Sequence, residues 1–500
     1  MMEMSSGGIF RDLDAWDPAP LCKHLRRGGF QREALETLGL PEHWMRSDVR
    51  SAALLGHAQD GSPVETLIRL FTLGEPVDGE RALIALGDSI HGLLKIGFLQ
   101  AGGGVIRSNY QIIPMADGRW LMADGWMACD FLKRQAEQTA DFVMGLGPSS
   151  LLLASLTPSV QGRVLELACG IGWLSGNLAK AGLPVVATDL NMRALVLGRF
   201  SARLCGIEGI DFRLGDGFTT VAGEQFDLIV ANPPYVQSPG GTMIYKEAPA
   251  GDPVCARLLR DVPAYLAPGG IAVVLINWTH ATDDDWTEAP LSWVPPEGTR
   301  RWLFQTDCLS PADYAWQWIS NDPRFPGEQK AIDEMHRWLA HYREQGVQRI
   351  SGGFIVIQKC AAGTEWTRTE SRAIANIDSN AGAEILRVLE NETWLAGNPT
   401  LLDCHFEVPA NIRAEAGMIL GPQGWERETI RLISPARLAY DGQIDENILR
   451  LLAIVREGKT PAALVAEIRT SPEFAAIPDL PEKIEDLVRE LVRHGMLSPI

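Results

Sequence analysis

The sequence predicts an α/β protein with a central, largely parallel sheet and mainly helical domains before and after it. Short apolar segments typical of buried strands alternate with amphipathic segments typical of helices between residues 162 and 276. The apolar segment Ile229–Ala231 then runs directly into Asn232-Pro233-Pro234-Tyr235, where two prolines without backbone donors must end the strand. Open α/β sheets bind their ligands at such carboxyl ends, so we expect the functional site here.

The composition indicates a globular protein of several domains. The chain has 500 residues, of which 46% are hydrophobic and 22% charged, and no apolar run is long enough to span a bilayer. Residues Met1–Gly8 lack the basic and then apolar pattern of a secretory signal, so we expect a cytoplasmic protein. The eight cysteines include no close pair typical of zinc or redox sites, and we predict reduced thiols and no metal site.

The charge balance bears on the partners. A net charge of −18 disfavours nonspecific binding to DNA or RNA. The densest basic segment, Lys23–Arg27, is interpreted as a solvated helix face, with a local nucleic-acid contact as the alternative. We therefore favour a protein or small-molecule partner and predict no membrane association, whereas the oligomeric state is left open.

Changes in pattern divide the chain into four predicted parts: residues 1–125, 126–360, 361–435 and 436–500. In the first part, helices over Gly79–Leu86 and Ser89–Phe98 precede a predicted hairpin of Val105–Pro114 with Gly118–Met122. Helices followed by a hairpin resemble a winged-helix module, which serves DNA binding, protein interaction or substrate covering. Asp130–Met144 is predicted to be a linking helix that either closes over a cofactor or only joins two domains.

The last two parts have a different pattern. The mixed segment 361–435 is expected to contain a helix over Ala383–Leu389 and a strand over Leu401–Val408. The final part has three segments with helical periodicity and again resembles a small winged-helix domain: Ile444–Arg456, Pro461–Arg469 and Glu482–His494.

The first strand of the predicted sheet leads into a glycine turn that suits a nucleoside. Gly170 and Gly172 allow close backbone approach, and Asp189 ends the next strand, where a carboxylate accepts both hydroxyls of a ribose. Dinucleotide sites have a third glycine, which is Ser175 here, and Glu166 before the turn would repel a pyrophosphate. A cationic cofactor is therefore favoured.

The segments Glu166–Gly172, Ala187–Asp189, Gly215-Asp216 and Asn232–Tyr235 resemble successive motifs of class I methyltransferases. The subgroup resembled is the N-methyltransferases with an Asn-Pro-Pro-Tyr loop, which includes release-factor glutamine, small-domain ribosomal RNA guanine and adenine amino methyltransferases. The resemblance runs from about residue 141 to 359, and the three-part layout resembles a bacterial family described only as methyltransferases. One departure is Ala168-Cys169, where the family usually begins with glycine.

This resemblance implies a Rossmann-like sheet of seven strands with an antiparallel last pair, and S-adenosylmethionine as the cofactor. The implied last pair is Trp302–Gln305 with Gly353–Gln358. The methionine part would be held by Glu166 and the glycine turn, the ribose by Asp189 and the adenine amino group by Asp216. The full set of implied cofactor-binding residues is Glu166, Ala168, Cys169, Gly170, Gly172, Asp189, Leu190, Asp216, Gly217 and Asn232.

The loop Asn232-Pro233-Pro234-Tyr235 supplies the predicted catalytic residues. Its Asn and Pro oxygens accept the hydrogens of a planar nitrogen and its tyrosine stacks on that plane, so catalysis rests on positioning. We predict methyl transfer to an amide or amine nitrogen, with a protein glutamine or a small metabolite favoured by the acidic charge. The alternatives are an rRNA or nucleobase N-methyltransferase and a non-catalytic S-adenosylmethionine sensor. The sequence does not identify the acceptor or the role of the terminal domains.

Overall fold

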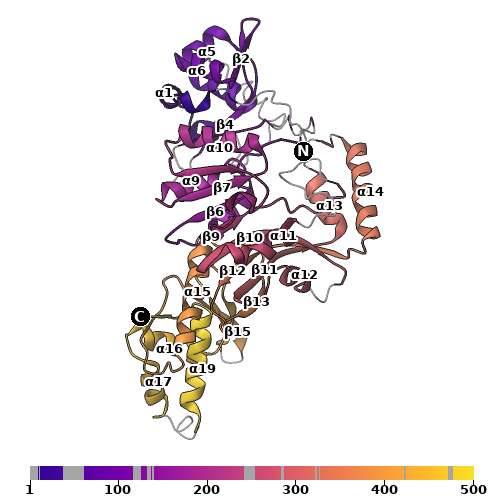
Figure 1. Cartoon of the computed structure of the whole chain (residues 1–500). Helices are drawn as coiled ribbons and strands as arrows, with labels where there is room; N and C mark the ends of the chain where they lie inside the picture. Colours follow the sequence, from indigo (N-terminus) through magenta and orange to yellow (C-terminus); the bar gives the residue numbers. More distant parts are fainter. Residues whose placement is uncertain are drawn as a thin grey trace. The chain divides into compact units, whose positions relative to one another are not determined.

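The computed structural model describes residues 10, 12–37, 61–115, 125–131, 134, 137, 140–240, 254–282, 286–320, 322, 324–325, 327–421, 424–470 and 477–500. The chain divides into two compact units (Figure 1). Unit 1 comprises Met1–Ser150, Gln161–Pro295 and Cys308–Ile355, and unit 2 comprises Leu151–Val160, Pro296–Asp307 and Val356–Ile500. Among the described residues, no helix is both long and apolar enough to cross a membrane.

The central sheet has eight described strands in the order β13-β11-β12-β10-β9-β6-β7-β8. Their bounds are β6 Val164–Leu167, β7 Val185–Asp189, β8 Ile210–Leu214, β9 Phe226–Ala231, β10 Leu266–His280, β11 Thr299–Leu309, β12 Arg349–Lys359 and β13 Trp366–Ser371. The pairs β6/β7, β7/β8, β6/β9 and β9/β10 are parallel. The Rossmann-like sheet is as predicted, but the count of seven strands was wrong, because β13 adds a parallel edge strand to β11.

Helices connect the parallel strands. They are α9 Trp173–Lys180, α10 Met192–Leu204 and α11 Val254–Tyr265, with a 3-10 turn η3 over Thr219–Val221; α8 Pro148–Leu156 precedes β6. α9 packs on β7 and β8, α10 on β7 and β8, and α11 on β10. Strands β6 and β9 are almost entirely buried, which is why they appear in the sequence as continuous apolar runs rather than as alternating patterns.

The N-terminal elements belong to unit 1. They are η1 Leu13–Ala15, α1 Ala19–Arg27, α2 Arg32–Thr37, α4 Pro63–Leu67, η2 Ile68–Leu73, β1 Val77–Asp78, α5 Gly79–Leu86, α6 Ser89–Ile96, β2 Leu99–Gly102, β3 Val105–Ser108, β4 Gln111–Pro114 and β5 Trp126–Cys129. The helices predicted over Gly79–Leu86 and Ser89–Phe98 are confirmed.

The predicted N-terminal hairpin was wrong in its pairing. β3 pairs with β2 across the Gly103-Gly104 turn, whereas β4 pairs with β5. The expected long strand is broken because the Ser108 hydroxyl donates to the carbonyl of Tyr110 at 2.6 Å and accepts from its N–H at 3.3 Å. The other predicted strand, Gly118–Met122, lies outside the described residues. The winged-helix likeness stays a prediction.

Two helices are inserted between β11 and β12. They are α13 Pro311–Ile319 and α14 Glu328–Glu344, preceded along the chain by the short α12 Glu288–Ser292 (Figure 1). α13 begins where the Ser310 hydroxyl accepts from Asp313 N–H at 3.1 Å, with Pro311 in the first turn. α13 packs against α14, and their shared core contains Tyr314, Trp338 and Tyr342.

The C-terminal elements belong to unit 2. They are η4 Ile374–Asn376, α15 Ala381–Gly397, β14 Phe406–Glu407, β15 Arg413–Gly421, β16 Gly424–Ile433, β17 Asp441–Ile444, α16 Glu446–Arg456, α17 Pro461–Ile468, α19 Leu480–Arg493 and β18 Ser498–Pro499. The three predicted C-terminal helices are present, and their apolar faces form one core. The predicted strand Leu401–Val408 is reduced to β14, while the hairpin β15–β16 was not predicted, because its strands are mostly solvent-exposed and show no buried face.

Candidate active site

The register of the sheet brings the sequence motifs to one edge. The last residue of β6 lies opposite Thr188 of β7 on one side and Ala231 of β9 on the other. Asp189 and Asn232 therefore follow at the same level, on the two strands that flank β6. Because adjacent strands lie about 4.8 Å apart, the two backbones are about 10 Å apart across the glycine turn. Asp189 is opposite the last residue of β8, so the segment leading to Asp216 starts at this edge too.

The turn after β6 is left-handed at three positions. The φ angle is +53° at Ala168, +54° at Gly170 and +65° at Gly172, and α9 begins at Trp173. A Cβ on Gly172 would lie 2.9 Å from Cε1 of Phe212, whereas one on Gly170 would meet nothing within 4 Å. Glycine at 172 is required for space, and the open side of Gly170 leaves the backbone accessible to a ligand. Ala168, the departure noted in the sequence, adopts a conformation that favours glycine.

We expect Gly170→Ala to lower the free energy of unfolding by about 1 kcal/mol, because it adds left-handed strain alone. Gly172→Ala is expected to cost a further 1–3 kcal/mol or so, because the new methyl group also overlaps Phe212. Urea denaturation followed by circular dichroism measures both. Gly182→Ala is the control, since Gly182 also has a positive φ and open space. Equal costs for all three variants would contradict the steric role of Gly172.

Glu166 of β6 is buried and bound at the first turn of α9. One carboxylate oxygen accepts the backbone N–H of Ser175 at 2.7 Å and also the Ser175 hydroxyl. Burial raises the pKa of Glu166 to about 7 and the charge of Asp189 raises it further, against the lowering effect of the Ser175 hydrogen bonds. A cation bound next to this carboxyl group would stabilise its charged form.

Asp189 is fixed by backbone donors on both sides. Its carboxylate accepts the N–H of Gly170 at 2.8 Å and the N–H of Asn191 at 2.8 Å. Burial raises the pKa of Asp189, and these backbone hydrogen bonds oppose the rise. Asn191 caps α10 by accepting the N–H of Arg193 and donates its amide to the carbonyl of Asp141 at 3.0 Å. Through Asn191, Asp189 is therefore connected to Asp141, in the segment that precedes the sheet.

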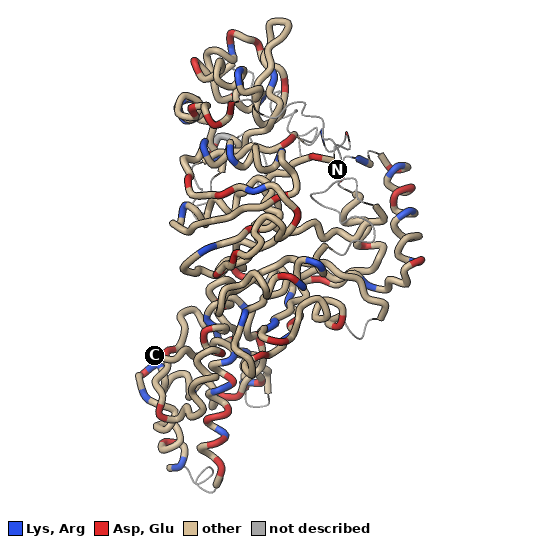
Figure 2. The backbone as a smooth tube through the Cα atoms, in the orientation of Figure 1, with Lys and Arg blue, Asp and Glu red and all other residues tan. Residues whose placement is uncertain are grey.

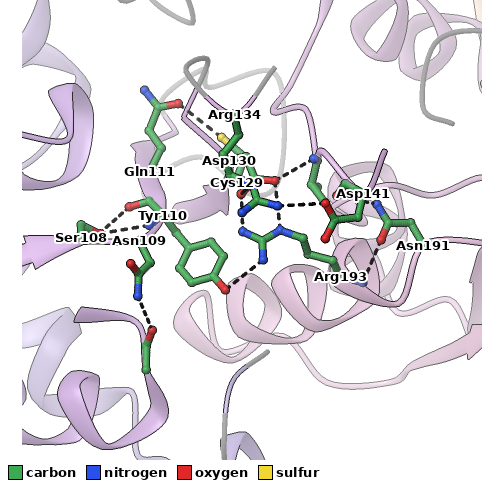
Figure 3. Close-up of polar contacts among 12 residues, drawn as sticks. Ser108, Asn109, Tyr110, Gln111, Cys129, Asp130, Arg134, Asp141, Asn191 and Arg193 are labelled. Carbon is green, nitrogen blue, oxygen red and sulfur yellow. Dashed lines mark hydrogen bonds and ion pairs between the residues drawn. The ribbon is translucent and has the colours of Figure 1, made fainter. Parts of the chain in front are cut away.

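A buried polar network continues from Asn191 (Figure 3). The guanidinium of Arg193 binds both oxygens of Asp130, at 3.1 and 2.5 Å, and donates to the hydroxyl of Tyr110 at 3.3 Å. Asp130 also accepts the N–H of Val143 at 2.9 Å and lies 3.5 Å from the guanidinium of Arg134. The network joins the N-terminal strands to α10.

This network explains why the linking helix predicted over Asp130–Met144 was wrong at its end. Residues 142–147 form neither helix nor strand. The Asp130 N–H donates to the Val143 carbonyl at 3.0 Å, and the Val143 N–H donates to the Asp130 carboxylate at 2.9 Å. Satisfying the buried Asp130 carboxylate takes the backbone N–H that a helix would have used internally.

The residues expected at the adenine lie beside α11. Asp216 is bound by Arg257 of α11 through two contacts of 2.7 and 3.1 Å, both side chains being partly exposed. The ring of Phe218 stacks on Tyr265 with centroids 4.2 Å apart. An exposed ion pair of this kind contributes little stability, so it presents only a small barrier to a ligand that would replace the guanidinium.

The other residues implied for the cofactor differ in accessibility. Cys169 is buried, and burial raises the pKa of its thiol, which fits a structural rather than a nucleophilic role. Leu190 is 56% exposed beside Asp189. Gly217 has a φ of +54°, as the turn before Phe218 requires.

The loop after β9 holds the predicted catalytic residues. The Asn232 side chain is half-buried and donates from Nδ2 to the hydroxyl of Ser149 at 3.1 Å. Pro233 is buried, while Pro234 and Tyr235 are half-buried. Because the Asn232 side chain donates an amide N–H to Ser149, its orientation is set and its oxygen is the end that can accept a hydrogen bond.

Residues 146–284 match the family described as "Methyltransferase small domain". These residues form a class I methyltransferase domain. The methyltransferase domain includes β6–β10 and every residue singled out from the sequence as a site residue. Residues 45–109 and 387–499 match two other families, each described as a domain of unknown function (DUF7059 and DUF7782).

Three relatives are similar to part of this chain. The ribosomal protein uL3 glutamine methyltransferase of Bradyrhizobium diazoefficiens is 32% identical over 29% of this chain and 51% of its own length. The release factor glutamine methyltransferase of Xylella fastidiosa is 33% identical over 25% of this chain and 50% of its own length. The ribosomal RNA small subunit methyltransferase C of Sodalis glossinidius is 36% identical over 17% of this chain and 25% of its own length. The chain thus spans about half or less of the length of these three relatives.

S-adenosylmethionine is the cofactor of this domain family, and the site fits it. The open backbone at Gly170 provides room for close approach, while Glu166 and Asp189 supply carboxylates suited to an ammonium and to ribose hydroxyls. The sequence reasoning missed Ser149 and the clamping role of Asn191. Asn191 had a usable signal, since an Asn before an apolar helix is a capping residue, whereas Ser149 contacts a residue 83 positions away.

Proposed function

We propose that this chain is an S-adenosylmethionine-dependent N-methyltransferase whose acceptor is a planar amide or amine nitrogen, with a protein glutamine favoured. The observation that carries the proposal is the position of Asn232, whose amide is oriented by Ser149 at the same sheet edge as the glycine turn and Asp189. A protein that only senses the cofactor has no need of an oriented acceptor amide on this loop.

The roles of the loop residues follow from their chemistry. The Asn232 oxygen and the carbonyl of Pro233 would accept the two hydrogens of the substrate nitrogen, which favours the partly pyramidal nitrogen of the transition state. The stiff Pro233-Pro234 segment holds these acceptors in one geometry, and the ring of Tyr235 would set the plane of the substrate. Bound S-adenosylmethionine supplies an electrophilic methyl group, so positioning carries catalysis and no covalent enzyme intermediate is needed.

The pKa of Glu166 makes cofactor affinity pH-dependent. Because burial raises this pKa to about 7, the free site is mostly protonated at pH 5.5 and mostly charged at pH 7.5. A cationic cofactor favours the charged form, so we expect its affinity to rise about twentyfold over this range, as the growing charged fraction implies. Calorimetric titration at several pH values measures the change. Glu166→Gln is the control and should give a nearly flat profile; a wild-type profile equally flat would refute the role of Glu166.

The same group makes the free protein less stable as the pH rises. The pKa of Glu166 lies above its unfolded value, so the folded state binds more protons between about pH 4.5 and 7 and loses stability as the pH rises through this window. The Glu166→Gln variant should lack this part of the slope.

Two observations favour a protein acceptor over RNA. Two of the three relatives described above are named as glutamine methyltransferases. In addition, α14 packs against α13 beside the loop Asn232–Tyr235, which we call the acceptor loop. α14 carries interspersed acidic and basic residues rather than a basic stripe (Figure 2). Binding of a phosphate backbone relies on clustered Lys and Arg.

The second candidate is methylation of an rRNA base, which the relative named as a ribosomal RNA small subunit methyltransferase favours. The deciding experiment incubates the purified chain with methyl-labelled S-adenosylmethionine and fractionated bacterial extract. Label in protein, sensitive to the Asn232→Ala substitution, is the expected result. Label in RNA would replace the acceptor, and binding of the cofactor without transfer to any fraction would favour a sensor.

A further inference from the structure

The inserted helices α13 and α14 bind the residue Gln237, which directly follows the acceptor loop and Val236. Gln237, two residues beyond Tyr235, donates its backbone N–H to the hydroxyl of Tyr314 at 3.1 Å. Its carbonyl accepts the hydroxyl of Tyr342 at 2.5 Å. Both backbone groups of one residue are thus bound by tyrosines from two different helices, in place of the sheet ladder that the chain has left.

The same point is tied to the neighbouring strand β10. The side-chain amide of Asn277 donates to the Tyr314 hydroxyl at 2.8 Å. The backbone carbonyl of Asn277 accepts from the side-chain amide of Gln237 at 3.2 Å. Gln237 also donates to the carbonyl of Tyr235 at 3.1 Å. The loop, the strand and α13 therefore share one set of hydrogen bonds.

The two tyrosines lie in a rigid setting. Tyr314 and Tyr342 are each 2% exposed and pack in one cluster with Trp338, against which Tyr235 also packs. Burial raises the pKa of both hydroxyls, so both stay protonated and the Tyr342 hydroxyl remains a donor at physiological pH. A deprotonated phenol would repel the Gln237 carbonyl instead.

We propose that Tyr314 and Tyr342, which we call the tyrosine clamp, are positioning residues that fix the acceptor loop for methyl transfer. This rests on the proposed function. The prolines restrict the backbone at 233 and 234 only, and the residues after them need an external anchor. α13 and α14 lie outside the residues that match the methyltransferase family, so the clamp is an addition of this chain to that domain.

The first test does not depend on activity. In the Tyr314→Phe variant, the Gln237 amide loses its hydrogen-bond acceptor, so its hydrogen exchange should speed up at least about tenfold, a rate factor that corresponds to the loss of one hydrogen bond. Exchange in amides of α9 should not change. Unchanged exchange at Gln237 would overturn the clamp, whether or not an acceptor has been found.

The second test measures turnover of the full chain with the acceptor fraction that the labelling experiment identifies. Tyr314→Phe and Tyr342→Phe should each lower kcat by about ten- to a hundredfold, as a loop shift of about 1 Å does. The Kd for S-adenosylmethionine should stay the same, because all the implied cofactor residues except Asn232 lie on or after other strands. Trp338→Phe is the matched control, since it loosens the same cluster without touching Gln237 and should lower Tm but not kcat.

The outcomes separate the two proposals. If wild-type protein transfers no methyl group, the proposed function fails and the exchange test alone decides the clamp. If wild-type protein is active and both tyrosine variants keep full kcat, the clamp is refuted while the function stands. A loss of kcat in Trp338→Phe equal to that in the tyrosine variants would also refute it, because packing and not the hydroxyl groups would then explain the effect.

Discussion

Asn232→Ala is expected to lower kcat by about a thousandfold, a loss of the size seen when one group that stabilises a transition state is removed. The alanine has no oxygen to accept the substrate N–H, and the contact with Ser149 disappears too. Cofactor affinity should change by less than about twofold, because the lost oxygen stabilises the transition state and not the complex with the cofactor. Calorimetry gives the Kd and a methyl-transfer assay gives kcat.

Two further variants and one control sharpen this prediction. Asp189→Ala should show the opposite pattern, with cofactor affinity reduced about tenfold or more through the lost hydrogen bonds to a charged acceptor. Ser149→Ala should lower kcat less than Asn232→Ala, because it frees the amide to rotate without removing it, whereas Ser150→Ala should have no effect. Equal loss of affinity and turnover in Asn232→Ala would contradict the assigned role.

Asp130→Ala is expected to lower the free energy of unfolding by about 3–5 kcal/mol, the usual cost of leaving a buried charge unpaired. Asp130 has no exposed side-chain surface, and its removal takes away the carboxylate that Arg193 and the Val143 N–H both bind. Urea denaturation measures the loss. Because Asp130 serves more partners than Arg193 does, Arg193→Ala should cost less.

The control for this network is an exposed ion pair. Glu36→Ala removes the partner of Arg32 on the surface of α2 and should cost less than about 1 kcal/mol. The double variant Asp130→Leu with Arg193→Met should recover part of the lost stability, because it leaves no unpaired charge in the interior. A cost for Asp130→Ala as small as that of Glu36→Ala would show that water reaches the network.

The sequence predicted most of the sheet edge where the site lies. Diproline after Ala231 ended β9, and glycine at 170 and 172 defined the turn after β6, because both residue types restrict or free the backbone locally. Once the strands are parallel, their carboxyl ends must share an edge, and Asp189 and Asn232 do so. The cofactor class followed from the chemistry of these few residues.

Other features could not be predicted from local sequence patterns. The predicted linking helix after Asp130 was wrong because a buried carboxylate captured the backbone N–H of Val143. The eighth strand was missed because β13 has an alternating pattern whose partner, β11, lies more than fifty residues away. Asp216 meets Arg257 only through the packing of α11.

By itself, the sequence determined the order of strands and turns from β6 to β10, the cofactor chemistry and the residues of the acceptor loop, since these depend on neighbours along the chain. Only the tertiary structure decided that Ser149 orients Asn232 and that Tyr314 and Tyr342 bind Gln237. These contacts join residues separated by 77 to 105 positions. They depend on how whole helices pack, and no pattern of spacing in one segment carries that information.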